Sequence, residues 1–354
     1  MLVSLINADI SLLTFFWGLT IFFLAISVFI CSVIVMRRVW RNKLADEKEK
    51  EKIALQDYLA LTLKKVGDEA YDLTRAPNCE ASEMSRVFLH YFRTLKGEKL
   101  EYLQEMISGS EWEEALTQNT FKGIRGVRMR CLRTLSYLDS QRSLQVIFDN
   151  LSSEDKYVRL TAARCLVRRK SLCYIGAIIE SLKEAFPQDY RILAGILEKF
   201  GPESVESLEG YISRETDSVV KTACLEALTL IMPAKTSLDF EQLMADESES
   251  VRSAALALSA VVEYESDVDP LRLGLQDEAT SVKIRAVKMA CNVKRMDLTA
   301  DLYKLVNDPV MWVRYWALRA IWLSGQAGQK FVATLASSQK MAEKVALEMR
   351  SGYA

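Results

Sequence analysis

Residues 277–286 read DEATSVKIRA, which is an acidic residue, then a Val-Lys pair, and a small residue four positions after the valine. The pair occurs in seven related copies: Val127-Arg128, Val158-Arg159, Tyr190-Arg191, Val220-Lys221, Val251-Arg252, Val282-Lys283 and Val313-Arg314. Successive copies lie 30 to 32 residues apart, and the fourth residue after each first member is cysteine or alanine. A period of this length indicates a repeat architecture, in which each repeat is one supersecondary unit.

Each copy predicts a helix with a defined beginning. The Asp or Ser before the pair can accept hydrogen bonds from the first amides of a helix, and Pro309 suits the first turn of the last one. The valine and the small residue lie one turn apart and form a buried stripe, where a small side chain lets helices approach closely. We expect the Arg or Lys to pair with the acidic cap of a neighbouring repeat. A second amphipathic segment, such as ADLYKLV at 300–306, separates the copies, so each repeat is predicted to be a helix hairpin.

The D-x-x-V-R-x-x-A pattern resembles the HEAT-repeat family in its short bacterial form of about 31 residues, also seen in phycobilin-lyase-type repeats. The resemblance covers residues 120–336 and implies an all-α solenoid of about seven HEAT-like hairpins. We expect residues 44–119 to form a juxtamembrane helical cap and residues 337–354 a C-terminal capping helix. HEAT arrays serve many binding tasks, so the resemblance implies no particular activity.

Residues 10–36 contain no charged side chain and reach about 40 Å as a helix, enough to span a bilayer. An uncleaved transmembrane anchor at 1–43 is favoured over a signal peptide, because the apolar run is long and no basic residue precedes it. Four basic residues follow the run: Arg37, Arg38, Arg41 and Lys43. The positive-inside rule then places the N-terminus outside and the larger, C-terminal part in the cytoplasm, at the inner (cytoplasmic) membrane of a bacterium.

Catalytic motifs are absent from the sequence. The seven cysteines form no CxxC pair, and the single histidine, His90, is interpreted as structural. Asp267 and Asp269 match a DxD motif, but they are interpreted as a helix cap and first-turn acid inside a repeat. We therefore expect no enzyme activity, no cofactor and no metal.

Charge is strongly segregated behind the net charge of −1. Residues 44–121 carry a net −6, residues 122–170 a net +8, residues 171–281 a net −13 and residues 282–354 a net +7. The candidate basic site comprises Arg125, Arg128, Arg130, Arg133, Arg159, Arg164, Arg168 and Arg169. Acidic protein or anionic lipid headgroups are favoured as its partner, whereas the neighbouring −13 segment disfavours nucleic acid.

A second candidate site lies in the last repeat, at Trp312, Tyr315, Trp316 and Arg319. These aromatic side chains are interpreted either as a binding patch or as packing beneath the C-terminal cap, and the sequence favours neither.

The functional hypothesis is a membrane-tethered cytoplasmic scaffold for a partner protein that is itself membrane-associated. We expect this partner to be a membrane enzyme or a secretion component, and the resemblance to bacterial proteins of this kind implies an association with envelope polysaccharide synthesis. The alternatives are a lyase-type subunit or chaperone that delivers a cofactor to a client protein, and a regulator that binds nucleic acid.

Overall fold

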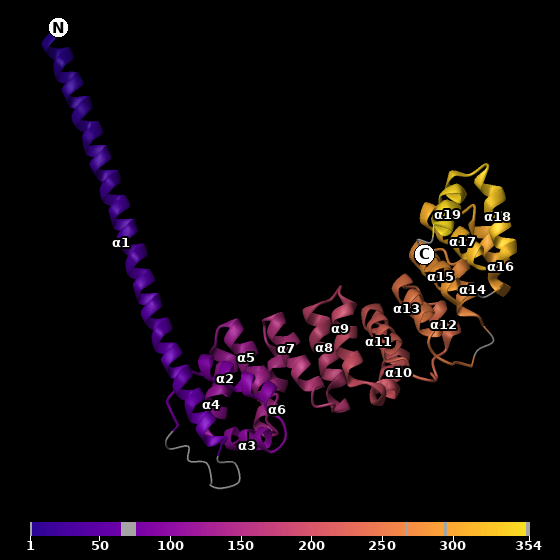
Figure 1. The fold of residues 1–354 in the computed structure, drawn as a ribbon, viewed down its shortest axis with the longest axis horizontal. Coiled ribbons are helices and arrows are strands. Elements are labelled where there is room, and N and C mark those ends of the chain that lie inside the picture. The colour runs from indigo at the N-terminus through magenta and orange to yellow at the C-terminus, as the bar shows by residue number, and fades with distance from the viewer. Residues whose placement is uncertain (1, 65–75, 266–267, 294–295, 352–354) are drawn as a thin grey trace. The chain divides into compact units, whose positions relative to one another are not determined.

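The computed structural model describes residues 2–64, 76–265, 268–293 and 296–351, and the chain forms two compact units, Met1–Asp139 and Ser140–Ala354. Helices make up most of both units (Figure 1), which confirms the predicted all-α class. Within the described ranges, one isolated bridge between Lys235 and Glu263 is the only pairing of extended backbone. We call the two parts unit 1 and unit 2.

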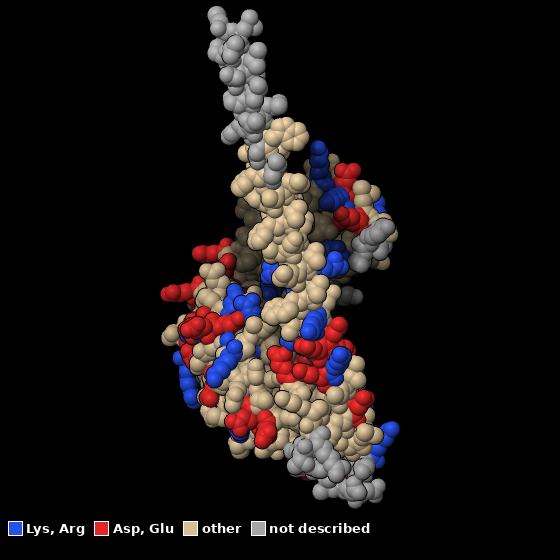
Figure 2. All heavy atoms as spheres, turned by 90° about the vertical axis from the view of Figure 1, so that its left-hand side faces the viewer, with Lys and Arg blue, Asp and Glu red and all other residues tan. Residues whose placement is uncertain are grey.

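Helix α1 (Leu2–Thr62) runs unbroken from the apolar segment into the charged segment that follows. Its part between Phe22 and Thr62 includes an 18-residue window with a mean hydropathy of 2.1, none of it buried inside the protein. Figure 2 shows the upper described part of this helix without charged side chains. By length and composition, α1 is able to cross a bilayer, as the sequence predicts.

The last turns of α1 pack into the core of unit 1. Leu55 and Leu59 are fully buried, and the ring of Tyr58 meets that of Trp112 edge-on, with 6.1 Å between their centroids. Because the same helix carries the apolar segment and these core residues, no linker separates the two.

Four further helices complete unit 1: α2 (Ala81–Thr94), α3 (Glu98–Ile107), α4 (Glu111–Lys122) and α5 (Arg125–Leu135). Helices α4 and α5 form the hairpin of the first repeat, and α5 also packs against α2. Phe92 stacks on Tyr137 at a centroid distance of 4.9 Å, and the Thr134 hydroxyl donates a hydrogen bond to the carbonyl oxygen of Ser85. The first repeat is therefore built into the helical cap that precedes it.

Unit 2 contains six hairpins and two terminal helices in its described part. The hairpins pair α6 (Gln141–Asp149) with α7 (Lys156–Val167), α8 (Ile175–Ala185) with α9 (Tyr190–Leu197), α10 (Val205–Arg214) with α11 (Ser218–Ile231), α12 (Phe240–Met244) with α13 (Glu249–Ser259), α14 (Pro270–Gln276) with α15 (Thr280–Val293), and α16 (Thr299–Leu305) with α17 (Met311–Leu323). The terminal helices are α18 (Gln326–Ala336) and α19 (Lys340–Arg350). Single 3-10 turns lie beside these helices: η2 (Asn150–Ser152), η3 (Leu172–Tyr174), η4 (Glu198–Phe200), η5 (Pro202–Ser204) and η6 (Met296–Leu298).

The second helices of the hairpins line one side of unit 2. Helices α9, α11, α13, α15 and α17 pack against one another in chain order, and more extensively than α12, α14 and α16 do. Figure 1 shows α13, α15 and α17 on the inner side of a bent row, with α12, α14 and α16 on the outer side. We call the side formed by α11, α13, α15 and α17 the inner surface.

The structure confirms the predicted buried stripe. Six valines are at most 7% exposed: Val127, Val158, Val220, Val251, Val282 and Val313. The small residues four positions later are at most 3% exposed: Cys131, Ala162, Ala194, Cys224, Ala255, Ala286 and Ala317. These side chains let consecutive second helices pack closely.

The expected ladder between repeats is also present. Three rungs follow one another along the stack: Lys221 Nζ to Asp246 Oδ2 at 2.8 Å, Arg252 Nε to Asp277 Oδ2 at 2.7 Å, and Lys283 Nζ to Asp308 Oδ2 at 2.9 Å. Each of these aspartates also accepts a hydrogen bond from the backbone amide two residues later, at 2.7 to 2.9 Å. One carboxylate thus holds the start of its own second helix and the second helix of the preceding repeat.

The third repeat departs from the ladder. Tyr190 replaces the valine and is half-buried, and Asp189 caps α9 without a side-chain hydrogen bond among the described residues. Lys183 of α8 pairs with Asp217 at 3.2 Å, in the place that Arg191 would take. Arg191 remains exposed beside the ring of Tyr190.

The expectation for Pro309 was wrong. Helix α17 begins at Met311, so Pro309 lies before it instead of in its first turn. Val310 lies in the turn that leads into the helix, and its amide donates a hydrogen bond to Asp308. Arg314 donates to the Pro309 carbonyl oxygen at 2.9 Å.

Candidate partner-binding surface

The inner surface changes character along unit 2. On α13 the side chains on this side are small, with Ala254 and Ala257 buried and Ser253 half-buried, whereas α15 and α17 present long cations and aromatic rings. The sixth residue after the valine reaches this surface at Glu226, Lys288 and Arg319. The third reaches it at Arg285 and Trp316 and is buried at Ala223 and Ala254. The repeat therefore fixes the backbone, and these two positions set the chemistry of the surface.

A cluster on α15 and α17 combines aromatic rings with cations. Its members, which we call the aromatic cluster, are Lys288, Trp312, Tyr315, Trp316 and Arg319. The Lys288 ammonium lies 4.9 Å from the Trp316 ring centroid, and the Arg319 guanidinium carbon lies 5.3 Å from the same centroid. Tyr315 contacts Trp312 and Trp316 edge-on, at centroid distances of 5.8 and 5.4 Å. Cations attracted to one ring hold that ring and each other in place.

The packing interpretation describes one side of the cluster. Tyr315 donates a hydrogen bond to Glu348 of α19 at 2.7 Å, so it packs beneath the last helix. Trp312, by contrast, is 52% exposed. The cluster is anchored on one side by the C-terminal helix and presents a large aromatic side chain to solvent on the other.

A second feature of the inner surface spans three helices. Arg285 of α15 reaches over α13, where its Nη1 lies 3.2 Å from the Ser253 hydroxyl, and ends 2.9 Å from Oε1 of Glu226 on α11. The Arg285 side chain is 33% exposed and that of Glu226 is 20% exposed. This contact joins repeats that are not adjacent, because the small side chains of α13 leave room above them.

The basic residues of α5 have separate environments. Arg128 Nε donates to the Thr120 carbonyl oxygen at 2.6 Å, so this side chain ties α5 to α4. Arg130 is half-buried, and its Nε has no hydrogen-bond partner among the described residues. Arg125 is exposed and Arg133 is half-buried.

The basic residues of α7 divide in a similar way. Arg159 contacts Glu184 of the next repeat and the Ser153 carbonyl oxygen, in the manner of a ladder rung. Arg164 and Arg168 are exposed, and Arg169 is half-buried. The α5 arginines belong to unit 1 and the α7 arginines to unit 2.

Most of the described residues that could take part in catalysis have structural roles instead. Burial raises the pKa of Cys131 and Cys291 to about 11 and that of Cys224 to about 12, which keeps these thiols protonated and unreactive. Asp269 caps α14 by accepting a hydrogen bond from the Leu271 amide at 3.1 Å, while Asp267 lies outside the described residues. His90 is exposed on α2 and packs its ring against Tyr91.

Sequence reasoning missed Lys288, Arg285 and Glu226. A signal was present in the register: the sixth residue after the valine is Arg133, Arg164, Glu226, Ala257, Lys288 and Arg319 in six of the copies. The periodic valines mark the core, whereas this sixth position carries a charged residue in five of these six copies.

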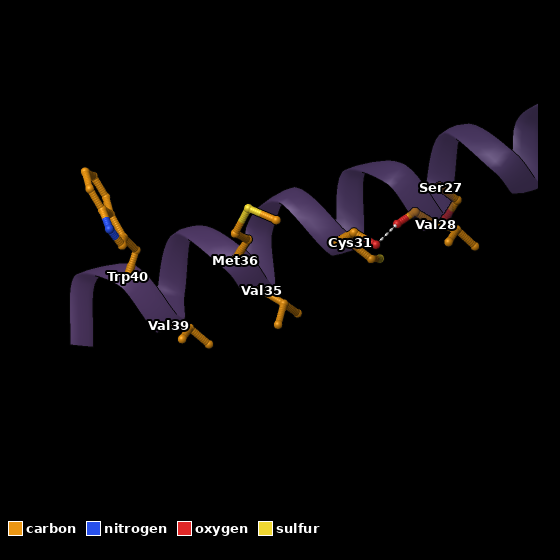
Figure 3. Close-up of a pocket in the computed structure, with 8 residues that line it drawn as sticks. Ser27, Val28, Cys31, Val35, Met36, Val39 and Trp40 are labelled. Atoms are coloured by element: carbon orange, nitrogen blue, oxygen red, sulfur yellow. Dashed lines mark hydrogen bonds between the residues drawn. The ribbon is translucent and has the colours of Figure 1, made fainter. Parts of the chain in front are cut away.

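The apolar part of α1 carries a stripe of its own. Figure 3 shows Ser27, Val28, Cys31, Val35 and Val39 projecting from the helix, and the Ser32 hydroxyl donates to the Val28 carbonyl oxygen at 2.8 Å. This bond satisfies the hydroxyl within the helix, which suits a segment surrounded by lipid.

Comparisons with known proteins bear on the fold. No protein-family model and no curated protein sequence matches the chain. Among solved structures, the chain is similar to human deoxyhypusine hydroxylase in complex with glycerol, with 18% identity, 71% of this chain and 99% of that chain covered, and a TM-score of 0.29. It is similar to Kap121p bound to Pho4p with 14% identity, 83% of this chain and 39% of that chain covered, and a TM-score of 0.43. It is similar to the CpcE–CpcF complex of phycocyanin lyase from Nostoc with 15% identity, 80% of this chain and 98% of that chain covered, and a TM-score of 0.22. Likenesses at these scores say nothing about function.

Proposed function

We propose that this chain is a membrane-anchored scaffold whose inner surface binds a partner protein on the cytoplasmic side. The half-exposed Trp312 within the aromatic cluster carries the proposal. Exposed tryptophan on a rigid support is typical of the anchor residues that dominate protein–protein binding. The two cations on Trp316 and the bond from Tyr315 to Glu348 hold that support in one arrangement before a partner arrives.

The membrane part of the proposal rests on α1. Its apolar part exposes large side chains such as Phe29 and Met36, at 69% and 72%, and these are unfavourable in water. Arg37, Arg38 and Arg41 follow directly, which favours a cytoplasmic location for both units. Anchoring confines the scaffold to the bilayer surface and raises its effective concentration toward membrane partners. A membrane enzyme or a component of envelope polysaccharide synthesis or secretion is the partner class that we propose.

The scaffold itself performs no reaction in this proposal. The inner surface offers rings, guanidinium groups and an ammonium group, all suited to holding a partner in place. Its thiol groups at Cys224 and Cys291 are buried.

Site-specific photo-crosslinking in native membranes tests the proposal. A photoreactive residue replaces Trp312 in the full-length chain, and a matched control carries it at Gln242, which is exposed on the outer helix α12. We expect position 312 to crosslink one recurrent membrane-associated protein that position 242 does not reach. Crosslinks from the two positions to the same proteins, or none from position 312, would contradict it.

A further inference from the structure

The inner surface carries more positive than negative charge near the aromatic cluster. Arg285, Lys288 and Arg319 lie on α15 and α17, and among the described residues only Arg285 forms an ion pair, with Glu226. Lys288 and Arg319 face the Trp316 ring, which attracts them weakly, and Glu348 on the Tyr315 hydroxyl adds one negative charge beside them. The surface is therefore complementary to a ligand with several negative charges.

We infer that the segment bound here is a short acidic peptide of the partner, and that Glu226 occupies the carboxylate position on Arg285 until this peptide displaces it. The inference rests on the proposed scaffold function and names its ligand. Peptide carboxylates pair with Lys288, Arg319 and the released Arg285. An apolar side chain of the peptide packs on Trp312.

Arg285 covers the small side chains of α13. Ala254 and Ala257 are 0% and 8% exposed, and Arg285 Nη1 lies 3.2 Å from the Ser253 hydroxyl. Displacement of Glu226 therefore places a peptide carboxylate beside Arg285 and Ser253.

Charge along the rest of unit 2 limits the ligand to a short segment. Residues 171–281 carry a net −13, so a long polyanion such as nucleic acid meets repulsion beyond the three cations. An acidic peptide of a few residues needs only those three cations and one aromatic contact. A peptide of that length stays beside α15 and α17, the helices that carry those cations.

Glu226 lowers the affinity for the peptide, because its carboxylate competes with a peptide carboxylate for Arg285. Arg285 stays paired before and after binding, so the exchange avoids leaving a partly buried guanidinium without a counter-charge. The internal pair competes with the ligand, and its loss is expected to tighten binding.

Fluorescence polarisation of the full-length chain in detergent tests the inference, with a labelled octaglutamate peptide bearing one terminal Leu as the probe. We expect Glu226→Gln to tighten binding about fivefold, the upper range for a partly exposed ion pair. Lys288→Gln combined with Arg319→Gln is expected to weaken it about tenfold or more. The matched control Lys330→Gln, on an exposed position of α18, is expected to leave binding unchanged. Arg285→Gln is expected to weaken binding and to abolish the effect of Glu226→Gln, a coupling that folding damage would not produce.

Two results overturn the inference. One is equal binding of octaglutamate and a serine-glycine octapeptide, or of an eight-nucleotide oligothymidylate. The other is a Glu226→Gln variant with unchanged affinity. The scaffold proposal survives either result if position 312 still crosslinks its partner, so the two failures are distinguishable.

Discussion

Arg252 and Asp277 form a two-pronged ion pair, with Nε to Oδ2 at 2.7 Å and Nη2 to Oδ1 at 2.9 Å. Their side chains are 16% and 7% exposed. The same carboxylate accepts the amide hydrogen of Ala279 at 2.7 Å, just before α15 begins. A single side chain therefore fixes the start of one repeat and joins it to the one before.

Replacement of Asp277 by alanine is expected to destabilise unit 2 strongly. The change removes a helix-start hydrogen bond and leaves a largely buried guanidinium without its counter-charge, at a cost of about 3 to 5 kcal/mol. Urea unfolding of the full-length chain in detergent, followed by circular dichroism, measures the difference. Glu278→Ala changes the exposed neighbour and is the control, with an expected effect within about 0.5 kcal/mol. Equal unfolding midpoints for the two variants would contradict the structural role of the rung.

Acidification is expected to weaken the ladder. Burial acts to raise the pKa of Asp277, but the hydrogen bonds from Arg252 and the Ala279 amide, with the Arg252 charge, outweigh it and hold the pKa below its ordinary value. The pKa values of Asp246 and Asp308 are lowered in the same way against burial, by Lys221 and Lys283 respectively and by backbone amides. A carboxylate whose pKa is lower in the folded than in the unfolded protein stabilises the fold at pH values above its unfolded-state pKa. This stabilisation is lost as the pH falls through the folded-state pKa. Melting temperatures of the wild type should therefore fall between about pH 5 and pH 2.

The Asp277→Asn variant provides the comparison for this pH dependence. Its melting temperature should be lower at neutral pH and should fall less on acidification, because one titrating group of the ladder is gone. Parallel curves for the variant and the wild type would count against the aspartate as a source of acid sensitivity.

A close helix contact makes Gly328 sensitive to substitution. A Cβ atom at this position of α18 would lie 1.8 Å from the Ile321 carbonyl oxygen of α17, which is backbone and cannot rotate away. Gly328→Ala is expected to lower stability by about 1 to 3 kcal/mol through overpacking. At Gly195 in α9 a Cβ atom would meet nothing within 4 Å, so Gly195→Ala should be neutral or stabilising by up to about 1 kcal/mol. Thermal melting of both variants measures the difference in stability. Similar losses of stability in the two variants would show that α17 and α18 approach each other less closely.

The natural cysteines report on membrane insertion and its direction. Cys31 and Cys173 are exposed on the protein, whereas Cys79, Cys131, Cys165, Cys224 and Cys291 are buried. A membrane-impermeant maleimide should label Cys173 in inside-out vesicles and not in sealed cells. It should reach Cys31 only after the bilayer is dissolved, because lipid covers that side chain. The variants Cys31→Ser and Cys173→Ser assign the two signals, and labelling of Cys173 from outside would reverse the proposed orientation.

The helical fold could be predicted from the sequence because its core positions repeat. Val251 and Ala255, like their counterparts, are buried for one physical reason that recurs at a constant spacing. The rung from Arg252 to Asp277 follows from the same spacing. The break at the third repeat could not be derived, because the pairing of Lys183 with Asp217 depends on where a first helix ends.

The candidate site was only partly predictable. Three aromatic residues close together in the last repeat, Trp312, Tyr315 and Trp316, indicated the aromatic cluster. The pair between Arg285 and Glu226 joins residues 59 positions apart, and it passes over the small side chains of α13. A local pattern does not specify a contact between helices of non-adjacent repeats.

The unbroken course of α1 has a geometric consequence for the proposed anchor. A helix with 3.6 residues per turn couples length to direction, so one residue added between the span and Leu55 would turn unit 1 by about 100° about the helix axis and lift it about 1.5 Å. Seven added residues would lift it about 10 Å and return its bearing to within about 20°. The charged segment that leaves the bilayer therefore sets both the distance of unit 1 from the bilayer and its rotation about the helix axis.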